Sequence, residues 1–469
     1  MPQPRGCLKQ RSLGTGATLA MAAAAAFAAS PVSAQTLTEA FAYAYNTNPQ
    51  ILAQRALLRA TDETVPQALS NWRPTVTLAG QAGFERAGTA IPGSRTTIGS
   101  FPTRSLDLRI TQPVYRGGRT EAATRQAINT VQSTRAQTLG VETTVFQAVA
   151  QAYLDVVRDQ TLVEVNRNNE QVLRRQLEAT QDRFRVGEVT RTDVAQAESS
   201  LAQATANRIS SEGQLEISRA NYSRAVGHPP GRLVQPRERP VLPATREEAL
   251  TLAMHNNPNV ISANFTELAA RDNIDVVRGQ LLPTISVVGD LNRNYSPSLL
   301  TLRQSRQDVA SITAQLTVPL YEAGTIWSQT RQAEQTVGQR RSQVDDARRF
   351  AVQQATTSWE TLQSGRAAIV SFGAAVRAAQ IALEGIQQEA LVGSRTVLDV
   401  LISEQQLFTT QSQLITAQHD AAVAEYNLAA AIGRLIAPEL RLPVQLYDME
   451  RHYRAVKDKL FGFGGGLKE

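Results

Sequence analysis

Stretches with a helix-forming composition occupy most of the chain. From Arg119 to Phe184, and again from Thr325 to Ala390, proline is absent and Ala, Gln, Arg, Glu, Leu and Val dominate. At 1.5 Å per residue, each stretch of about 66 residues makes a rod of roughly 100 Å. A compact core does not cover that length, so each rod must pack against other helices. A short break follows each rod, at Gly187 and at Gly393, and a helix-forming segment then resumes. The pattern predicts two antiparallel helical hairpins with tips at these glycines.

The returning helices carry a heptad pattern. In the second one, small and apolar residues recur at steps of three and four: Val400, Ser403, Leu407, Thr410, Leu414, Ala417, Ala421, Ala424, Leu428 and Ala431. The first begins the same series with Val194, Ala197, Leu201 and Ala204. A seam of small residues is typical of close coiled-coil contacts.

Four segments alternate apolar and polar residues with a period of two. They lie at 75–84, 105–111, 285–292 and 309–318, and a loop rich in Gly, Pro, Ser and Thr separates the first two, at 87–103. Pro113 is expected to end the second segment, and each run approaches the 9–11 residues that a tilted membrane strand needs. The alternative is a soluble sheet of ordinary amphipathic strands. That alternative is weaker, because no other strand pattern exists in the chain to complete such a sheet.

The chain repeats itself once. Glu39-Ala40 and Asn48-Pro49 recur as Glu248-Ala249 and Asn257-Pro258, and further matches follow in the same order: Pro74 with Pro283, Pro113 with Pro319, Tyr115 with Tyr321, Gly187 with Gly393, Asp193 with Asp399, Glu198 with Glu404, and Gly227 with Gly433. We therefore predict a first repeat over 35–238 and a second over 239–437. Each opens with a helix, the first of them over 37–70 and interrupted at Asn48-Pro49. Residues 438–469 are expected to form a segment packed at mid-height or a flexible tail.

The N-terminus predicts secretion. A basic start, an Ala-rich apolar stretch and the cleavage pattern Val32-Ser33-Ala34 are typical of a signal peptide over 1–34, with the mature chain beginning near Gln35. Beyond residue 34 no 18-residue apolar run is evident, so no transmembrane helix is expected. A secreted chain of this kind enters an outer membrane only as a β-barrel. Four strands cannot close a barrel, so strands in lipid would require several copies of the chain.

Charge and motifs exclude several functions. Three of the +6 net charges lie in the signal peptide, which leaves +3 on the mature chain, and its arginines alternate with acids instead of clustering. Nucleic acid is therefore not an expected partner. The single cysteine, Cys7, also precedes the mature chain, and the histidines lie in unrelated segments without metal-binding or catalytic spacing. We expect no catalytic residues, no cofactor and no metal.

Several segments resemble the TolC-type outer-membrane export channels. They are the opening run LTEAFAYAYNTNPQILAQRALLRATDETVPQALSNWRPTV, the strand exits TQPVYRGG and LTVPLYEAG, and the tip sequence VGSRTVLDVLISEQQLFTTQ with its weaker duplicate VGEVTRTDVAQAESSLAQA. The resemblance covers essentially the whole mature chain. It implies a mainly α-helical fold with membrane β-strands, assembled as a homotrimer. Four strands per chain would make a 12-stranded outer-membrane β-barrel, and the coiled-coil hairpins a periplasmic tunnel.

The resemblance also implies a function. Such a channel in the outer membrane of a Gram-negative bacterium is the passive exit duct of a tripartite system for type I protein secretion or multidrug efflux. Its expected partners are outer-membrane lipid, a periplasmic adaptor (membrane fusion) protein and an inner-membrane ABC or RND-type transporter. The main alternative is a periplasmic coiled-coil adaptor or structural protein, which shares helical hairpins but would lack two matched pairs of membrane-length strands.

By position in the tip motif, Asp399 resembles the family's pore-facing constriction aspartate. Arg395 resembles the tip arginine, and Thr192 and Asp193 resemble its partners on the neighbouring hairpin. Ile402 stands where some relatives carry a second aspartate, so the second constriction is expected to be apolar, and Ala390 replaces a tyrosine of the closing network. A structural role is compatible with these roles, because acids are favoured at helix N-termini after a glycine break.

Overall fold

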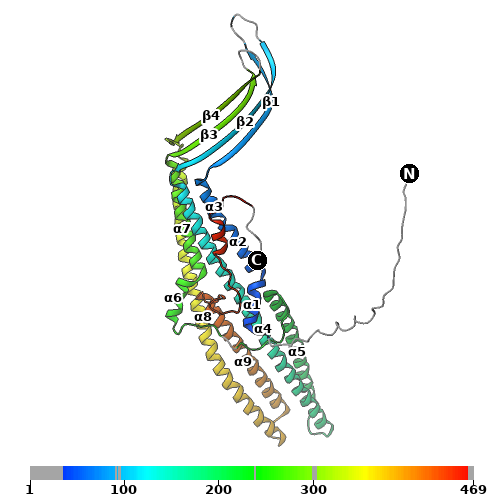
Figure 1. Cartoon of the computed structure of the whole chain (residues 1–469). Coiled ribbons are helices and arrows are strands. Elements are labelled where there is room, and N and C mark those ends of the chain that lie inside the picture. Colours follow the sequence, from blue (N-terminus) through cyan, green and yellow to red (C-terminus); the bar gives the residue numbers. More distant parts are fainter. Residues whose placement is uncertain (1–34, 90–91, 93–96, 237–238, 298–303, 463–469) are drawn as a thin grey trace, which may run out of the picture.

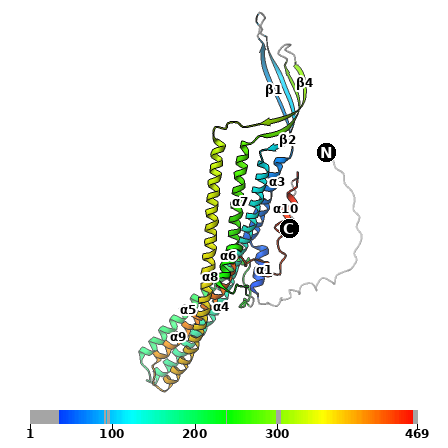
Figure 2. The same ribbon diagram turned by 90° about the vertical axis from the view of Figure 1, so that its left-hand side faces the viewer.

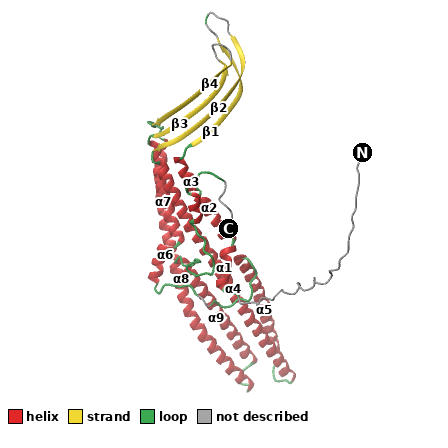
Figure 3. Ribbon diagram, in the orientation of Figure 1, coloured by secondary structure: helices red, strands yellow, loops and turns green. Residues whose placement is uncertain are grey.

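The computed structural model describes residues 35–89, 92, 97–236, 239–297 and 304–462. The predicted signal peptide and the end of the C-terminal tail lie outside these residues. A sheet stands at one end of an elongated molecule, and long helices extend from it to two separate tips (Figure 1). The view coloured by secondary structure separates these two regions, with strands above and helices below (Figure 3).

Both halves of the chain have the same order of elements, except that the single helix α7 of the second half takes the place of α2 and α3. The first half contains α1 (Leu37–Thr47), α2 (Pro49–Asp62), α3 (Thr64–Leu69), the 3-10 turn η1 (Ser70–Trp72), β1 (Thr75–Thr89), β2 (Thr97–Arg116), α4 (Arg119–Arg185) and α5 (Arg191–Val226). The second contains α6 (Arg246–Asn256), α7 (Pro258–Arg278), η2 (Gly279–Leu281), β3 (Thr284–Pro297), β4 (Gln304–Thr317), α8 (Thr325–Leu391) and α9 (Val397–Ala431), and the short α10 (Arg451–Val456) follows. The two predicted rods are α4 and α8, each of 67 residues.

The Asn-Pro pairs end one helix and begin the next. The side chain of Asn48 accepts the backbone N–H of Gln50 at 2.9 Å and so caps α2, whose first residue is Pro49. Its amide nitrogen donates to the carbonyl of Ala225 at 3.1 Å. Asn257 repeats both contacts, with Asn259 at 2.9 Å and Ala431 at 3.0 Å. The repeated motif therefore ties each short helix to the end of the returning helix in the same half.

The four strands form one antiparallel sheet in the order β1-β2-β3-β4. The predicted loop over 87–103 is wrong at both ends, since β1 continues to Thr89 and β2 begins at Thr97. Antiparallel pairing uses backbone groups, so a Gly- and Ser-rich sequence can extend the hairpin. Pro113 does not end β2 either. A β-bulge between Pro113 and Tyr115 accommodates the residue that lacks an N–H, and pairing with β3 resumes beyond it.

The helices follow the order of the strands and then pair as hairpins. In the upper part α2, α4, α7 and α8 pack in sequence, and in the lower part α4 pairs with α5 and α8 with α9. Figure 2 shows α8 along one edge of this layer. The predicted heptad seam of α9 is confirmed: Val400, Thr410, Ala417 and Leu428 are buried, and none of the other seam residues is exposed.

The main core lies at mid-height, where α1 meets α4, α5 and α9. Phe41 packs on Phe146 with ring centroids 5.1 Å apart and on Tyr426 at 6.0 Å. Tyr153 is fully buried, and its hydroxyl donates to the carbonyl of Val234 at 2.7 Å. The short helices and the segment after α5 are therefore fixed to the long rods at this level.

A strap at the C-terminus, defined here as residues 443–459, packs against the first helices. The Arg55 guanidinium carbon lies 4.4 Å from the ring centre of Tyr45 and 4.9 Å from that of Tyr447. The backbone N–H of Tyr447 donates to the Tyr45 hydroxyl at 2.9 Å. His452 contacts the buried carboxylate of Asp62 at 3.2 Å. The strap therefore belongs to the folded body, where it runs from the level of α1 toward the base of the sheet, since the carbonyl of Lys459 accepts from Arg73 just before β1.

One helix is apolar enough to meet a transmembrane criterion. An 18-residue window within α8 has a mean hydropathy of 1.4, and 6% of that window is buried. The expectation of no such run beyond residue 34 is therefore wrong, because Ala, Val and Ile offset the sparse charges. Length and composition alone are weak evidence for a span, and this helix pairs with α9 in a hairpin.

Candidate functional site

The two hairpin tips have the same backbone design. Gly187 and Gly393 adopt left-handed φ values of 78° and 77°, which side chains other than glycine rarely adopt. The next residue in each tip, Glu188 or Ser394, donates its N–H back to a carbonyl in the last turn of the preceding rod, at 2.9 and 3.0 Å. The glycines therefore allow each rod to end and the chain to reverse.

Each returning helix begins with a capping box. Thr396 accepts the backbone N–H of Asp399 at 3.2 Å, and the Asp399 carboxylate accepts the N–H and hydroxyl of Thr396, both at 2.9 Å. Thr190 and Asp193 form the same box at 3.3, 2.8 and 2.7 Å. Hydrogen bonds from the backbone and then the hydroxyl of Thr396, with the charge of Arg395, lower the pKa of Asp399. The carboxylate at this tip is therefore held ionised.

The predicted closing residues are not joined within one chain. The guanidinium of Arg395 donates to Glu389 of its own hairpin at 2.8 Å, while Thr192 lies exposed at the other tip. Ile402 follows Asp399 by nearly one turn of α9 and is 58% exposed.

Apolar residues nevertheless bring the two tips together. Leu173 of α4, Ala197 and Ala204 of α5, and Val397 and Leu401 of α9 form one buried cluster. Beside it, Gln387 donates to the largely buried Glu404 at 3.0 Å. Burial raises the pKa of Glu404 against the lowering effects of that hydrogen bond and of the Arg175 charge. The two tips are thus joined by a small apolar cluster.

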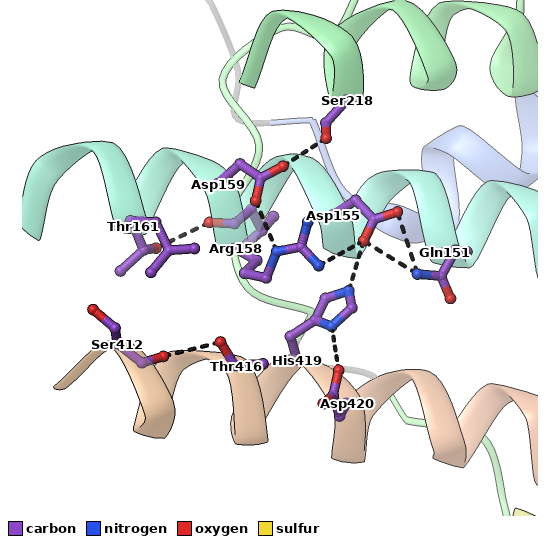
Figure 4. A network of polar contacts seen from close by, with 12 residues as sticks. Gln151, Asp155, Arg158, Asp159, Thr161, Ser218, Ser412, Thr416, His419 and Asp420 are labelled. Carbon is purple, nitrogen blue, oxygen red and sulfur yellow. Dashed lines mark hydrogen bonds and ion pairs between the residues drawn. The ribbon is translucent and has the colours of Figure 1, made fainter. Parts of the chain in front are cut away.

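A polar network higher up also connects the hairpins (Figure 4). The ring of His419 on α9 lies between Asp155 of α4 and Asp420, at 2.9 Å from each carboxylate. Arg158 donates to the buried Asp159 at 2.7 Å, and Ser218 of α5 donates to the same carboxylate at 2.6 Å. Burial raises the pKa of Asp155, but hydrogen bonds from His419 and Gln151 and the charges of His419 and Arg158 outweigh it and lower the pKa.

Sequence reasoning missed this network because His419 stands alone in its segment. The closely spaced Asp155, Arg158 and Asp159 on one rod were the available signal. Within the part of the chain that the structure describes, no group of three or more His, Cys, Asp or Glu residues is arranged to hold a metal.

The sheet presents one apolar and one polar face. On the apolar face Leu78 lies opposite Leu108, which lies opposite Leu291, which lies opposite Ala310. The other face carries Thr77, Arg109, Asp290 and Ser311 in one row, with an Arg109–Asp290 ion pair at 2.6 Å. Phe84 is 88% and Ile312 85% exposed, so the chain does not cover its own apolar face.

Comparisons with known proteins agree with this architecture. A family model described as outer membrane efflux protein matches residues 43–228 and 249–434. The chain is 32% identical over 429 residues to the outer membrane efflux protein BepC of Brucella suis biovar 1 (strain 1330), covering 91% of this chain and 92% of that protein. It is 26% identical to the outer membrane protein TolC of Vibrio cholerae serotype O1, with 83% and 89% covered. The crystal structure of the outer membrane protein VceC from Vibrio cholerae superposes with a TM-score of 0.74 at 20% identity, over 85% of this chain and 96% of that one.

Proposed function

The chain belongs to the outer membrane efflux protein family, and from that premise we propose that it is the exit duct of a tripartite export system. As in this family, the protein is located in the outer membrane of a Gram-negative bacterium and extends into the periplasm. The duct is passive, without catalytic residues, cofactor or resident metal. A periplasmic adaptor and an inner-membrane ABC or RND-type transporter open it, for type I protein secretion or multidrug efflux.

The observation that carries the proposal is a sheet with an uncovered apolar face joined directly to two 67-residue helices. β1 and β4 are edge strands, and lipid does not tolerate unpaired strand edges. Copies of the chain must therefore pair edge to edge. Three copies give 12 strands, and the rods below them give a tunnel of roughly 100 Å.

The repeat boundaries form part of the proposal. The mature chain would begin near Gln35 and consist of a first repeat over 35–238 and a second over 239–437. The shared order of elements and the repeated Asn-Pro contacts support this division.

The tips would form the gate. Three copies of Asp399 around the axis would make a cation-binding constriction, and Ile402 an apolar ring beside it. Arg395 of one chain would bond Thr192 and Asp193 of the next in the closed state. The small size of the apolar contact between the tips supports opening by hairpin movement.

The mass of the mature protein, extracted from the outer membrane and measured by light scattering with the detergent contribution subtracted, tests the proposal. We expect a mass near three chains, obtained only in detergent. A soluble monomer or dimer without detergent would contradict the channel and favour the alternative of a periplasmic coiled-coil adaptor or structural protein.

A further inference from the structure

We propose that arginines at the outer end of the apolar sheet face bind the phosphate groups of lipids in the outer leaflet. The inference rests on the proposed function, because it requires the sheet to be in a membrane. Below, the arginine row means Arg86, Arg104, Arg293 and Arg306.

Strand register places the arginine row on the apolar face. Arg86 follows Phe84 at the next position of that face on β1, and Arg104 follows Leu106 on β2. On β3, Arg293 is the next residue of the same face after Leu291, and Arg306 of β4 lies opposite Tyr295. Each strand therefore contributes one arginine, in every case toward the hairpin loops and away from the helices (Figure 1).

Three of the four arginines stand at the edge of the apolar band, and Arg86 lies further out, four residues beyond Ala82, the β1 residue opposite Arg104. Tyr295, opposite Arg306, lies ten residues beyond Ile285, which is about 33 Å along a strand and about 25 Å along the membrane normal at a typical tilt. An outer-membrane apolar band is about 25 Å tall, so Arg104 and Arg306 lie at its outer border and Arg293 just inside it. A long arginine side chain reaches the headgroups from such a position.

The row carries an excess of positive charge. Arg293 and Arg306 both contact Asp308, each with a nitrogen–oxygen distance of 2.8 Å, and Asp308 is the single acid on this face among the described strand residues. Four arginines against one aspartate leave donors for a further anion, since each guanidinium offers five N–H groups. On the polar face, by contrast, Arg109 is matched by Asp290.

The other end of the sheet has a different chemistry. There the arginines bond groups outside the apolar face: Arg73 donates to the carbonyl of Lys459 at 2.8 Å, and Arg116 contacts Asn71. The bulge after Pro113 brings Tyr115 opposite Ile285 and so onto the apolar face. Trp327 at the start of α8 is also exposed. Aromatic residues are typical of a membrane boundary, so Tyr115 marks the helix end of the apolar face as Tyr295 marks its hairpin end, and the arginine row distinguishes the hairpin end.

Phosphate borne by lipid is the anion that fits. Guanidinium groups bind phosphate through paired hydrogen bonds, and a row bordering an apolar surface meets both the headgroup and the acyl chains of one lipid. A phosphorylated glycolipid on the hairpin side of the membrane satisfies both requirements.

The test measures binding of diphosphorylated lipid A to the mature protein in mixed micelles, by native mass spectrometry and by titration. The test variant is R104Q/R293Q/R306Q/D308N. The matched control is R109Q/D290N, which removes an ion pair from the opposite face. Each arginine near an anionic surface contributes roughly fivefold in affinity, so we expect the test variant to bind at least about tenfold more weakly. The control should bind lipid A as tightly as the unchanged protein. R104Q alone keeps the contacts of Asp308 and should weaken binding a fewfold, and R104K should restore it.

The outcomes separate this inference from the proposed function. Equal affinity of the test variant and the unchanged protein, or equal binding of dephosphorylated lipid A, would overturn the lipid site while the trimer in detergent stays intact. If millimolar inorganic phosphate displaces lipid A from the protein, the arginine row binds a free anion, and the lipid site is also overturned. A protein that needs no detergent would refute the proposed function and this inference together.

Discussion

At the scale of residues, corresponding positions in the two halves share a structural role and differ in the function we propose for them. Asp193 and Asp399 close equivalent capping boxes with Thr190 and Thr396. Either change to asparagine keeps an acceptor but removes a negative charge from the first turn of a helix, at a similar cost of roughly 0.3–1 kcal/mol. Comparing the changes at Asp193 and Asp399 therefore separates an effect on helix stability from an effect on ion passage through the pore.

We predict that Asp399→Asn weakens block of the channel by multivalent cations. Losing three carboxylates from a narrow ring removes most of its attraction for cations, and half-block should require roughly tenfold more cation. Planar-bilayer conductance measures this. Asp193→Asn is the comparison, because it loses the same charge at the equivalent helix position but should keep the block. Unchanged block in Asp399→Asn would exclude Asp399 from the constriction.

A second prediction concerns the buried Glu142 of α4, which accepts the N–H of Ala437 at 2.5 Å. Burial raises the pKa of Glu142, opposed by that hydrogen bond and by the charge of Arg55. The carboxyl therefore contributes most to stability when protonated, below its ordinary pKa of 4.5, and this contribution is lost as the pH rises through the raised value.

Glu142→Gln keeps an acceptor without the charge, so the variant should gain stability over the unchanged protein as the pH rises above about 5. Thermal melting in detergent from pH 4 to 8 measures the difference. The control is Glu216→Gln, which removes an exposed carboxylate paired with Arg219 and should give no gain in stability. A stability difference between Glu142→Gln and the unchanged protein that is constant or falls as the pH rises would contradict a raised pKa of Glu142.

The roles of such buried residues could not be predicted from sequence. The capping residues follow a local motif of four positions, so both tips were recognisable. Glu142 meets Ala437 and His419 meets Asp155 across more than 260 residues, and nothing near either residue in the chain specifies its partner.

At the scale of elements, the helices could be predicted from their uniform composition. The ends of the strands were difficult to predict, because backbone pairing decides where they lie. The rods end within one residue of the prediction because a long proline-free stretch stops abruptly at a glycine turn. The strands extend beyond their alternating patterns because hairpin pairing continues through residues without a pattern. Pro113 shows the same limit, since only the bulge reveals how the strand accommodates it.

The contact between the hairpins allows a further prediction. Leu401→Ala removes a buried side chain from the cluster with Leu173 and Ala197, at a cost of about 2–4 kcal/mol. Hydrogen exchange should therefore become faster in the tip segments of α5 and α9. Ile402→Ala, at the neighbouring exposed position, should change that exchange little. Equal effects would mean that the cluster does not hold the tips together.

At the scale of the whole molecule, the end of the chain stabilises its beginning. The strap places Tyr447 on Arg55 and His452 against the buried Asp62, so α2 depends on residues almost 400 positions away. The sequence does not predict these contacts, because the strap has no strong hydrophobic pattern. Its aromatic residues were compatible with a packed segment, which was one of the two predicted outcomes for residues 438–469.

We predict that truncation after Leu442 lowers the free energy of unfolding by roughly 1–3 kcal/mol while the protein remains trimeric. Arg55 would lose one of its two rings, and Asp62 would lose its histidine. Thermal melting and light scattering of the detergent-extracted protein measure both effects. Truncation after Gly462 keeps the strap and should melt like the full chain, and a similar loss in both truncations would refute the role of the strap.

The equal length of α4 and α8 also limits how a gene for this protein can change. A residue inserted into one rod rotates everything beyond it by about 100° and moves one tip 1.5 Å further than the other. Four helices run together below mid-height, so a lasting change in length must occur in all of them, in whole heptads. Insertions and deletions should therefore accumulate at the hairpin loops and the chain ends, and the reach of the duct into the periplasm should change only in steps of about 10 Å.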